Sequence, residues 1–255
     1  MKKSCFVMLV AAVAMMVAAG PIQAMDADEL IAKHIEATGG KEKIESIQST
    51  KILGKFMTQG MEFPFSMTQK RPNFLRIEAE AMGMTIVQAF DGTAGWSINP
   101  MMGSTDPQPM GDFENKSFEM QADMDGGLMN YAKKGYTVEY LGEEDVEGTP
   151  CYKLRMDTKK DIVIDFFFDK EYFLIVKQAN TMTMDENVIE SDTYMSDYQD
   201  VNGMVIPFSV ETRMGDMVAN QIVFETVEQN VEVDDSIFVM PPKAAPAAPE
   251  ATEIK

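Results

Sequence analysis

The sequence predicts a mainly antiparallel β protein with few helices, an α+β fold, on three observations. Apolar and polar residues alternate over most of the chain, as in strands that bury one face. The segments between the predicted strands are short, so neighbouring strands should run antiparallel. One amphipathic helix precedes the strands, and one helical stretch interrupts them. A parallel dinucleotide-binding fold, which needs a helix between successive strands, is therefore not expected.

The first 24 residues have the pattern of a secretory signal peptide. Lys2 and Lys3 precede an apolar run, Phe6–Ala19, which ends at a Gly-Pro pair. The run is too short for a stable transmembrane helix, and Cys5 precedes it, where it cannot carry a lipid anchor. We expect cleavage near Ala24, export and no membrane anchor.

One folded domain is expected over residues 25–242, followed by a disordered Ala/Pro-rich tail, residues 243–255. The domain should begin with a helix over Asp26–Thr38, which has acidic residues in its first turn and Gly39-Gly40 after it. No tandem repeat is present, so a solenoid or propeller is not expected.

Strands are predicted from Ile47 onward by their alternation. In the segment 61–70, Pro64 lies on the polar face and predicts an edge strand, because proline cannot donate to a ladder. Between Pro100 and Gly135 the alternation stops, and a helical pattern predicts an inserted flap over the sheet. The other predicted strands are 73–81, 84–90, 94–99, 136–141, 151–158, 162–168, 172–179, 188–198, 207–214 and 217–227.

Charge and cysteine content exclude several kinds of partner and site. Asp and Glu number 41 against 22 Lys and Arg, a formal net charge of −19. Such a chain lacks the basic footprint that nucleic acids require, and anionic headgroups would repel it. Cys151 is the one cysteine after the signal segment, so an intramolecular disulfide is not expected, and a small strand side chain is its expected role.

The residues for catalysis or metal binding are few, so we expect no enzyme, no metal and no cofactor. His34 is the only histidine, and it lies among apolar residues of the first helix, where packing is the simplest role. A zinc site needs several His or Cys ligands. The run 121–126 resembles a calcium loop but has Gln at its first position and Ala132 at its twelfth. The acidic groups Glu143-Glu144-Asp145 and Asp234-Asp235 are expected on solvated loops.

The positive feature is a large number of methionines, 24 in all, together with 15 phenylalanines. Methionine is flexible and polarisable, so methionine-rich surfaces suit apolar ligands of variable shape. These residues could simply form the core. If the sheet is curved and the helical flap can lift from it, however, the same surface becomes an acyl-chain site.

A set of short motifs, in order along the chain, resembles the periplasmic lipoprotein carriers and outer-membrane lipoprotein-sorting proteins, the LolA-like family. The motifs are Lys70-Arg71-Pro72-Asn73-Phe74, Asp91-Gly92 with Trp96 and Asn99-Pro100, the segment 196–203 continuing to Pro207, and Phe238 with Pro241-Pro242. The resemblance covers most of the chain after the signal segment.

The resemblance implies an incomplete, strongly curved antiparallel β-barrel closed by a helical lid, which binds lipoprotein acyl chains. It assigns the role of lid latch to Arg71. Alternation from there places Leu75, Ile77 and Ala79 on the cavity face, with Trp96 and Ile98 lining the same cavity. The expected lining residues are Phe63, Phe65, Met67, Leu75, Ile77, Met84, Ile86, Trp96, Ile98, Phe113, Phe118, Leu128 and Met129.

Three functions remain open at this stage. The first is a monomeric carrier that takes acylated lipoproteins or other lipids from an inner-membrane donor to an outer-membrane acceptor. The second is a lipid-sensing or protein-interaction module of the cell envelope without transport activity, whose acidic surface docks a basic partner. The third is an enzyme, which the shortage of acid–base groups disfavours. A fold alone does not decide among them.

Overall fold

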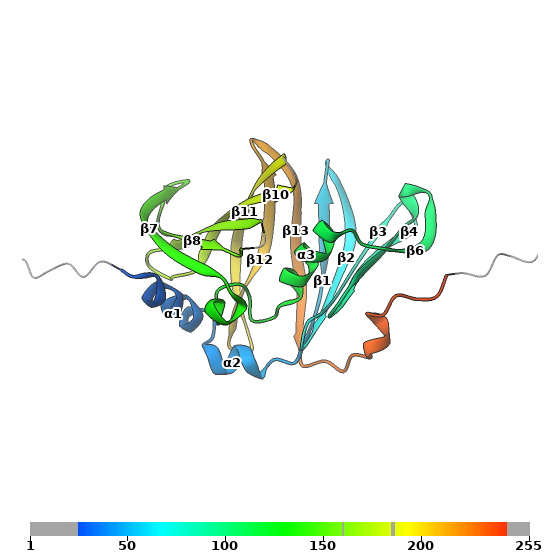
Figure 1. The fold of residues 1–255 in the computed structure, drawn as a ribbon, viewed down its shortest axis with the longest axis horizontal. Coiled ribbons are helices and arrows are strands. Elements are labelled where there is room, and N and C mark those ends of the chain that lie inside the picture. Colours follow the sequence, from blue (N-terminus) through cyan, green and yellow to red (C-terminus); the bar gives the residue numbers. More distant parts are fainter. Residues whose placement is uncertain (1–24, 160, 185–186, 244–255) are drawn as a thin grey trace, which may run out of the picture.

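The computed structural model describes residues 25–159, 161–184 and 187–243. In these residues, 13 strands form one open antiparallel sheet in the order β6-β5-β4-β3-β2-β1-β13-β12-β11-β10-β9-β8-β7 (Figure 1). The predicted signal peptide and residues 244–255 of the predicted tail lie outside the described residues. In the part that is described, no helix is both long and apolar enough to cross a bilayer.

The N-terminal part of the chain contains α1 (Ala27–Ala37), α2 (Lys41–Ser46), β1 (Ser49–Thr58), β2 (Met61–Lys70), β3 (Phe74–Ala81), β4 (Met84–Asp91), β5 (Gly95–Asn99), η1 (Pro100–Met102), β6 (Ser104–Pro109), α3 (Asp112–Ala122) and η2 (Tyr131–Lys134). The C-terminal part contains β7 (Thr137–Val146), β8 (Thr149–Asp157), β9 (Ile162–Asp169), β10 (Ile175–Met184), β11 (Asn187–Val201), β12 (Met204–Met214), β13 (Met217–Gln229) and η3 (Asp235–Ile237).

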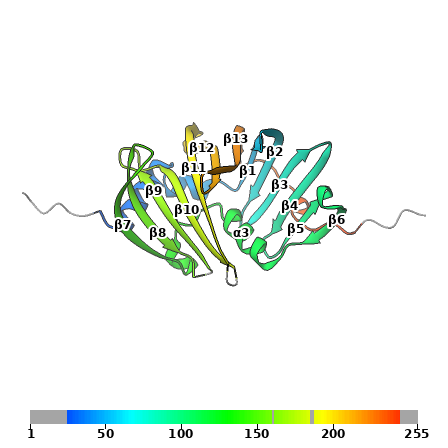
Figure 2. The same cartoon turned by 90° about the horizontal axis from the view of Figure 1, so that it is seen from above.

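The sheet is made of two meanders joined by the first and the last strand. β1 pairs with β13, and the register shifts between Leu53 and Gly54. A Cβ on Gly54 would lie 2.1 Å from the carbonyl oxygen of Val223, so only glycine fits this close approach. Figure 2 shows the result, an open arc with β7–β10 in one arm, β3–β6 in the other and α3 between them.

The predicted first helix is confirmed, and its apolar side docks on one arm of the sheet. Asp26 caps α1 by accepting a hydrogen bond from the Glu29 N–H at 2.7 Å. Leu30 and Ile31 are buried in a cluster with side chains of β8, β9 and β10. This cluster, the first-arm core, has as its buried members Leu30, Ile31, Leu128, Leu154, Met156, Ile162, Ile164, Phe166, Phe168 and Ile175.

The interrupting segment differs in detail from the prediction. Its helix, α3, ends at Ala122, whereas the helical pattern continued to Tyr131. Asp125-Gly126-Gly127 follows, and adjacent glycines disfavour a helix through their backbone entropy. A short strand, β6, precedes α3 and was not predicted, because its sequence STDPQP has two prolines and no apolar alternation.

The prediction that Pro64 marks an edge strand was wrong. β2 lies inside the sheet, between β1 and β3. Pro64 is opposite Lys55 of β1, but the ladder with β3 extends only to the Phe65–Ala79 pair. The proline therefore lies just beyond the end of the β2–β3 ladder, where a strand inside the sheet tolerates a missing N–H donor.

His34 fixes α1 to the arm of the sheet by a polar contact. Its Nδ1 lies 2.9 Å from the carbonyl oxygen of Phe173, and its ring meets the edge of Phe168 with centroids 5.2 Å apart. Burial between these residues lowers the pKa of His34, although the hydrogen bond to Phe173 opposes the shift. The imidazole thus acts in packing, as the sequence suggested.

This environment predicts that stability decreases on mild acidification. The folded state disfavours the protonated imidazole, so below the ordinary His pKa of about 6.5 the unfolded chain binds a proton that the folded chain does not. The free energy of unfolding should be unaffected by this group above that pH and should fall below it. Urea unfolding at pH 7 and pH 5.5 measures the change.

His34→Gln is the matched variant, since it removes the only histidine of the chain. Its unfolding midpoint should change less than that of the wild type between the two pH values, at which carboxylates are still ionised. An equal decrease in both proteins would contradict this role of His34.

Candidate functional site

A cavity of about 630 Å³ lies on the concave side of the sheet, between α3 and the strands β8 to β13. Its volume is within the range of ordinary ligand pockets. None of the described side chains that line it is charged, although a quarter of all residues in the chain are. The lining residues are Ser117, Met120, Gln121, Gly127, Met156, Ile162, Ile164, Phe166, Gln178, Asn180, Met182, Ser191, Thr193, Thr212 and Asn220.

One wall of the cavity is apolar. β9 contributes Ile162, Ile164 and Phe166, alternate residues that share one face of the strand. Met156 of β8 is opposite Ile164, and Met120 extends from α3. Several of these side chains also belong to the first-arm core, so the wall is a rigid surface.

The opposite wall carries uncharged polar side chains in cross-strand register. Gln178 of β10 is opposite Thr193 of β11, which is opposite Thr212 of β12, and Thr212 is opposite Asn220 of β13. Asn180 repeats the pattern one step along, opposite Ser191. The amide nitrogen of Asn180 lies 3.4 Å from both Ser191 O and Thr193 Oγ1, which are long contacts. The cavity therefore offers amide and hydroxyl groups alongside an apolar surface.

The segment after α3 crosses from one arm of the sheet to the other. Phe118 and Ala122 of α3 are buried with Leu75, Phe90 and Met110 in a second cluster, which we call the second-arm core. Six residues beyond Ala122, Leu128 is buried in the first-arm core. The connecting residues 123–127 therefore span from one arm to the other.

Arg71 binds these connecting residues, 123–127, which we call the crossing segment. Its Nε donates to Ile47 O at 2.8 Å, and its Nη2 donates to Ile44 O at 3.0 Å. The same Nη2 donates to Asp125 Oδ1 at 2.6 Å, in an ion pair whose side chains are about one-fifth exposed. One guanidinium thus joins the end of α2 to the crossing segment. Lys134 makes a parallel ion pair with Asp123.

Several predicted site residues lie together on the concave face. They are in β2 and in the arm formed by β3–β6, away from the 630 Å³ cavity. Met67 and Ile77 pack against the second-arm core with Leu75 and Phe118. The register places Phe63, Phe65, Met84 and Ile86 on the same face. Phe113 lines a separate hollow near Asp161 and Met184, and Met129 is buried close to Leu128. None of the predicted residues lines the 630 Å³ cavity.

Trp96 and Ile98 lie on the opposite face, so the expectation that they share a cavity with Leu75 was wrong. Trp96 pairs with Ala89, which pairs with Arg76, whereas Leu75 pairs with Phe90. The indole N–H donates to Phe238 O at 2.7 Å, and Phe238 stacks on Phe74. The C-terminal segment around η3 thus covers an outer apolar patch that the sequence pattern assigned to the interior.

The cavity was not predicted from the sequence, because one of its walls is polar and the inward face of a strand is expected to be apolar. In β10 and β11, Gln178, Asn180, Ser191 and Thr193 alternate with residues such as Ala179. A hydrophobic-inward rule places Ala179 inside, but it packs with Val176 and Tyr194 around Phe167 on the outer face. The signal that could have revealed the cavity was the presence of amide and hydroxyl side chains at alternate positions of two adjacent strands.

The other candidate groups of the sequence have structural partners. Cys151 is fully buried in β8, as expected, and burial raises the pKa of its thiol to about 11. Glu143 and Glu144 are exposed on β7, not on a loop, and pair with Lys170 and Lys153. Asp234 caps η3, and Asp235 pairs with Lys70. Among the described residues, no group of three His, Cys, Asp or Glu has metal-site geometry.

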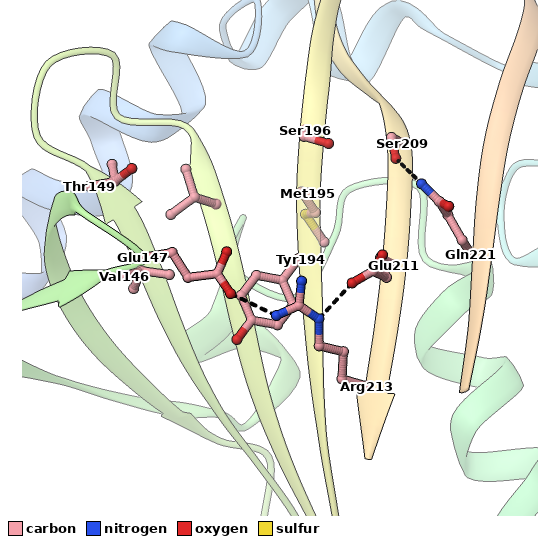
Figure 3. A pocket seen from close by; sticks show the side chains of 11 residues that line it. Val146, Glu147, Thr149, Tyr194, Met195, Ser196, Ser209, Glu211, Arg213 and Gln221 are labelled. Atoms are coloured by element: carbon pink, nitrogen blue, oxygen red, sulfur yellow. Dashed lines mark hydrogen bonds and ion pairs between the residues drawn. The ribbon is translucent and has the colours of Figure 1, made fainter. Parts of the chain in front are cut away.

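A second hollow, of about 370 Å³, lies on the outer face of β11 and β12 (Figure 3). Arg213 donates to Glu147 at 2.7 Å and to Glu211 at 2.6 Å, and its guanidinium lies 4.0 Å from the Tyr194 ring centroid. The hydrogen bonds to Glu147 and Glu211 raise the pKa of Arg213. Both carboxylates pair with the one guanidinium, so this site ties the β7–β8 turn to β12.

No protein-family profile matches the sequence, and no curated protein matches it. Solved structures do match the fold. A LolA superfamily protein from Nitrosomonas europaea has a TM-score of 0.57 at 11% identity, over 85% of this chain and 98% of that one. A domain named for outer membrane lipoprotein sorting, from Vibrio parahaemolyticus, has a TM-score of 0.55 at 8% identity, over 82% and 95%.

A DUF1329 family protein from Desulfovibrio piger has a TM-score of 0.54 at 12% identity, covering 83% of this chain and 96% of that one. These matches extend over nearly the whole length of each neighbour and over more than four-fifths of this chain. The chain has the fold of the LolA superfamily and of lipoprotein-sorting domains.

Proposed function

We propose that this protein is a periplasmic carrier that binds the acyl chains of lipoproteins or other lipids in the 630 Å³ cavity and moves them toward the outer membrane. The observation that carries the proposal is a cavity with one apolar wall, one uncharged polar wall and no charged lining side chain among the described residues. An acyl chain gains about 0.8 kcal/mol per buried methylene on the apolar wall. Ester, amide or hydroxyl groups of the ligand can bond to the polar wall.

Two further observations support the proposal. The LolA superfamily protein and the lipoprotein-sorting domain share the fold, although their low identity supports the ligand class only as an analogy. Residues 1–24 have the pattern of an export signal, which is consistent with a periplasmic carrier. An inner-membrane donor and an outer-membrane acceptor belong to this proposal as partners.

The structure also supports a specific role for Arg71 as the latch of the crossing segment. This segment and α3 form one side of the cavity, through Ser117, Met120 and Gly127. Movement of this side would widen the entrance for a large ligand. Arg71 is the cation that holds the segment to α2, so we assign it control of the open population.

The first prediction is that filling the cavity blocks ligand binding. Thr193→Trp places a large side chain on the polar wall and should weaken binding of a fluorescent fatty acid by at least about tenfold, or about 1.4 kcal/mol. Fluorescence titration of the purified protein measures the affinity.

Thr181→Trp is the matched control. Thr181 is also a half-buried strand threonine, but it pairs with Glu190 on the other face of the sheet. Its affinity should stay within about twofold of the wild type, a change below 0.5 kcal/mol. A wild type without affinity for acyl ligands, or equal losses in both variants, would refute the proposed site.

The second prediction is that Arg71→Leu speeds ligand release. A hydrogen bond to a charged group contributes about 1.5–3 kcal/mol, so loss of the Arg71–Asp125 contact should raise the dissociation rate by about tenfold or more. Transfer of a preloaded fluorescent fatty acid to acceptor vesicles measures the rate. Asp125→Asn removes the same ion pair and should act in the same direction.

Arg155→Leu controls for the loss of an arginine ion pair elsewhere. Arg155 bonds Asp165 at 2.6 and 2.8 Å on the outer face of β8 and β9, away from the crossing segment. Its release rate should equal that of the wild type. Unchanged release from Arg71→Leu would remove Arg71 from the mechanism. Ligand that is bound but never transferred would favour the lipid-sensing module.

A further inference from the structure

Four hairpin turns of the sheet expose methionine side chains to solvent. We call this set the methionine rim: Met61, Met82, Met101, Met102, Met214 and Met217. Met102 is 84% exposed, Met82 71% and Met217 66%. Eight methionines are exposed in the described residues, and six of them belong to this set. The exposed methionines are therefore concentrated in these turns and at the strand ends beside them.

The four turns lie at one edge of the sheet. They connect β1 to β2, β3 to β4, β5 to β6 and β12 to β13. Because every neighbouring pair is antiparallel and β1 pairs with β13, these connections all leave the same side. Figure 1 shows the β1–β2 and β12–β13 hairpins at the top, with α1 and α2 at the bottom.

The turns have an unusual composition for exposed chain. Turn residues are commonly Gly, Asn, Asp, Ser and Pro, and a methionine adds no turn geometry of its own. Here the turn segments read TQGM at 58–61, AMGM at 81–84, NPMMG at 99–103 and MGDM at 214–217. Large apolar side chains grouped in solvent mark an interaction surface.

Charge identifies the kind of surface that these turns fit. Three of the four segments hold no charged residue and the fourth holds one, Asp216, in a chain of net charge −19. A basic protein partner would be met by a cluster of acidic residues, whereas these four segments hold only Asp216. Turn tips that are apolar, flexible and almost free of charge suit the interfacial region of a lipid bilayer.

The rim also adjoins the cavity. Thr212 and Asn220 of the cavity wall are two and three residues from Met214 and Met217. Met182, another lining residue, lies two residues before the exposed Met184 at the end of β10. The edge that carries the methionines is thus the edge nearest one end of the proposed ligand site.

We propose that the methionine rim docks the protein transiently on a zwitterionic lipid surface, with the hairpin tips in the interface and the acidic body in water. This goes beyond the proposed function, because it assigns a surface and an orientation to ligand exchange. The acidic body disfavours anionic headgroups, so the interaction should weaken as anionic lipid is added.

Vesicle flotation tests the proposal. The purified full chain should float with phosphatidylcholine vesicles and should bind less to vesicles that contain phosphatidylglycerol. The triple variant Met82→Gln, Met102→Gln, Met217→Gln should reduce binding to phosphatidylcholine at least about tenfold. All three positions are strongly exposed, so folding should be unaffected, which circular dichroism checks.

The matched control changes three exposed apolar residues away from the rim: Tyr172→Gln, Val239→Gln, Met240→Gln. These side chains are 62%, 54% and 46% exposed. This control should bind vesicles as the wild type does. Absence of wild-type flotation, or equal losses in both triple variants, would overturn the proposal. A dimer that only the rim variant disrupts would instead assign the surface to a second copy.

Fatty-acid titration in solution separates this inference from the proposed function. The rim variant should keep the wild-type affinity for the free fatty acid, since it leaves the cavity lining unchanged. Flotation that depends on the rim, without affinity for fatty acid, would overturn the carrier proposal and support the rim. Affinity for fatty acid without flotation would overturn the rim alone.

Discussion

The pairing of the first strand with the last is the constraint on which the rest of the molecule depends. β1 and β13 are more than 150 residues apart in the chain, yet they form the seam between the two arms. The seam continues past the strands, where Asn230 accepts from Gln48 N at 2.7 Å and donates to Ser49 O at 2.8 Å. Through it the two meanders become one continuous sheet.

This seam explains how one sheet can have two different interiors. Each arm builds its own buried cluster, one with α1 and one with α3. Neither cluster fills the 630 Å³ cavity, so strands β10 to β13 keep half-buried side chains that face it. The polar wall arises there, where amides and hydroxyls meet water and are not buried at a cost. A ligand site thus remains where the core is incomplete.

Much of the architecture could be predicted from local patterns. The first helix, the hairpins and the antiparallel arrangement follow from periodicity and short connections, which depend on neighbours in the sequence. β6 could not be found, since its prolines and polar residues form a strand only because β5 offers an edge. Pro64 was assigned to an edge strand for a similar reason. Where the β2–β3 ladder ends depends on β3, which begins ten residues later in the chain.

The site was harder to predict, because alternation shows that a strand has two faces but does not show which face is concave. Leu75 and Trp96 are both apolar residues of alternating strands, and only the register places them on opposite sides. The crossing segment, with Arg71 and Asp125, joins residues far apart in the chain. Such contacts depend on how the sheet bends, which local sequence patterns do not show.

The attachment of the C-terminal segment to Trp96 determines what an optical measurement can report. Trp96 is the only tryptophan in the chain, it is almost wholly buried, and its N–H bonds to Phe238 on the outer face. Its fluorescence emission therefore reports whether the residues around η3 remain packed against Trp96. Trp96 does not line the 630 Å³ cavity, so intrinsic tryptophan fluorescence would report release of the C-terminal segment directly and would not report contact with a ligand.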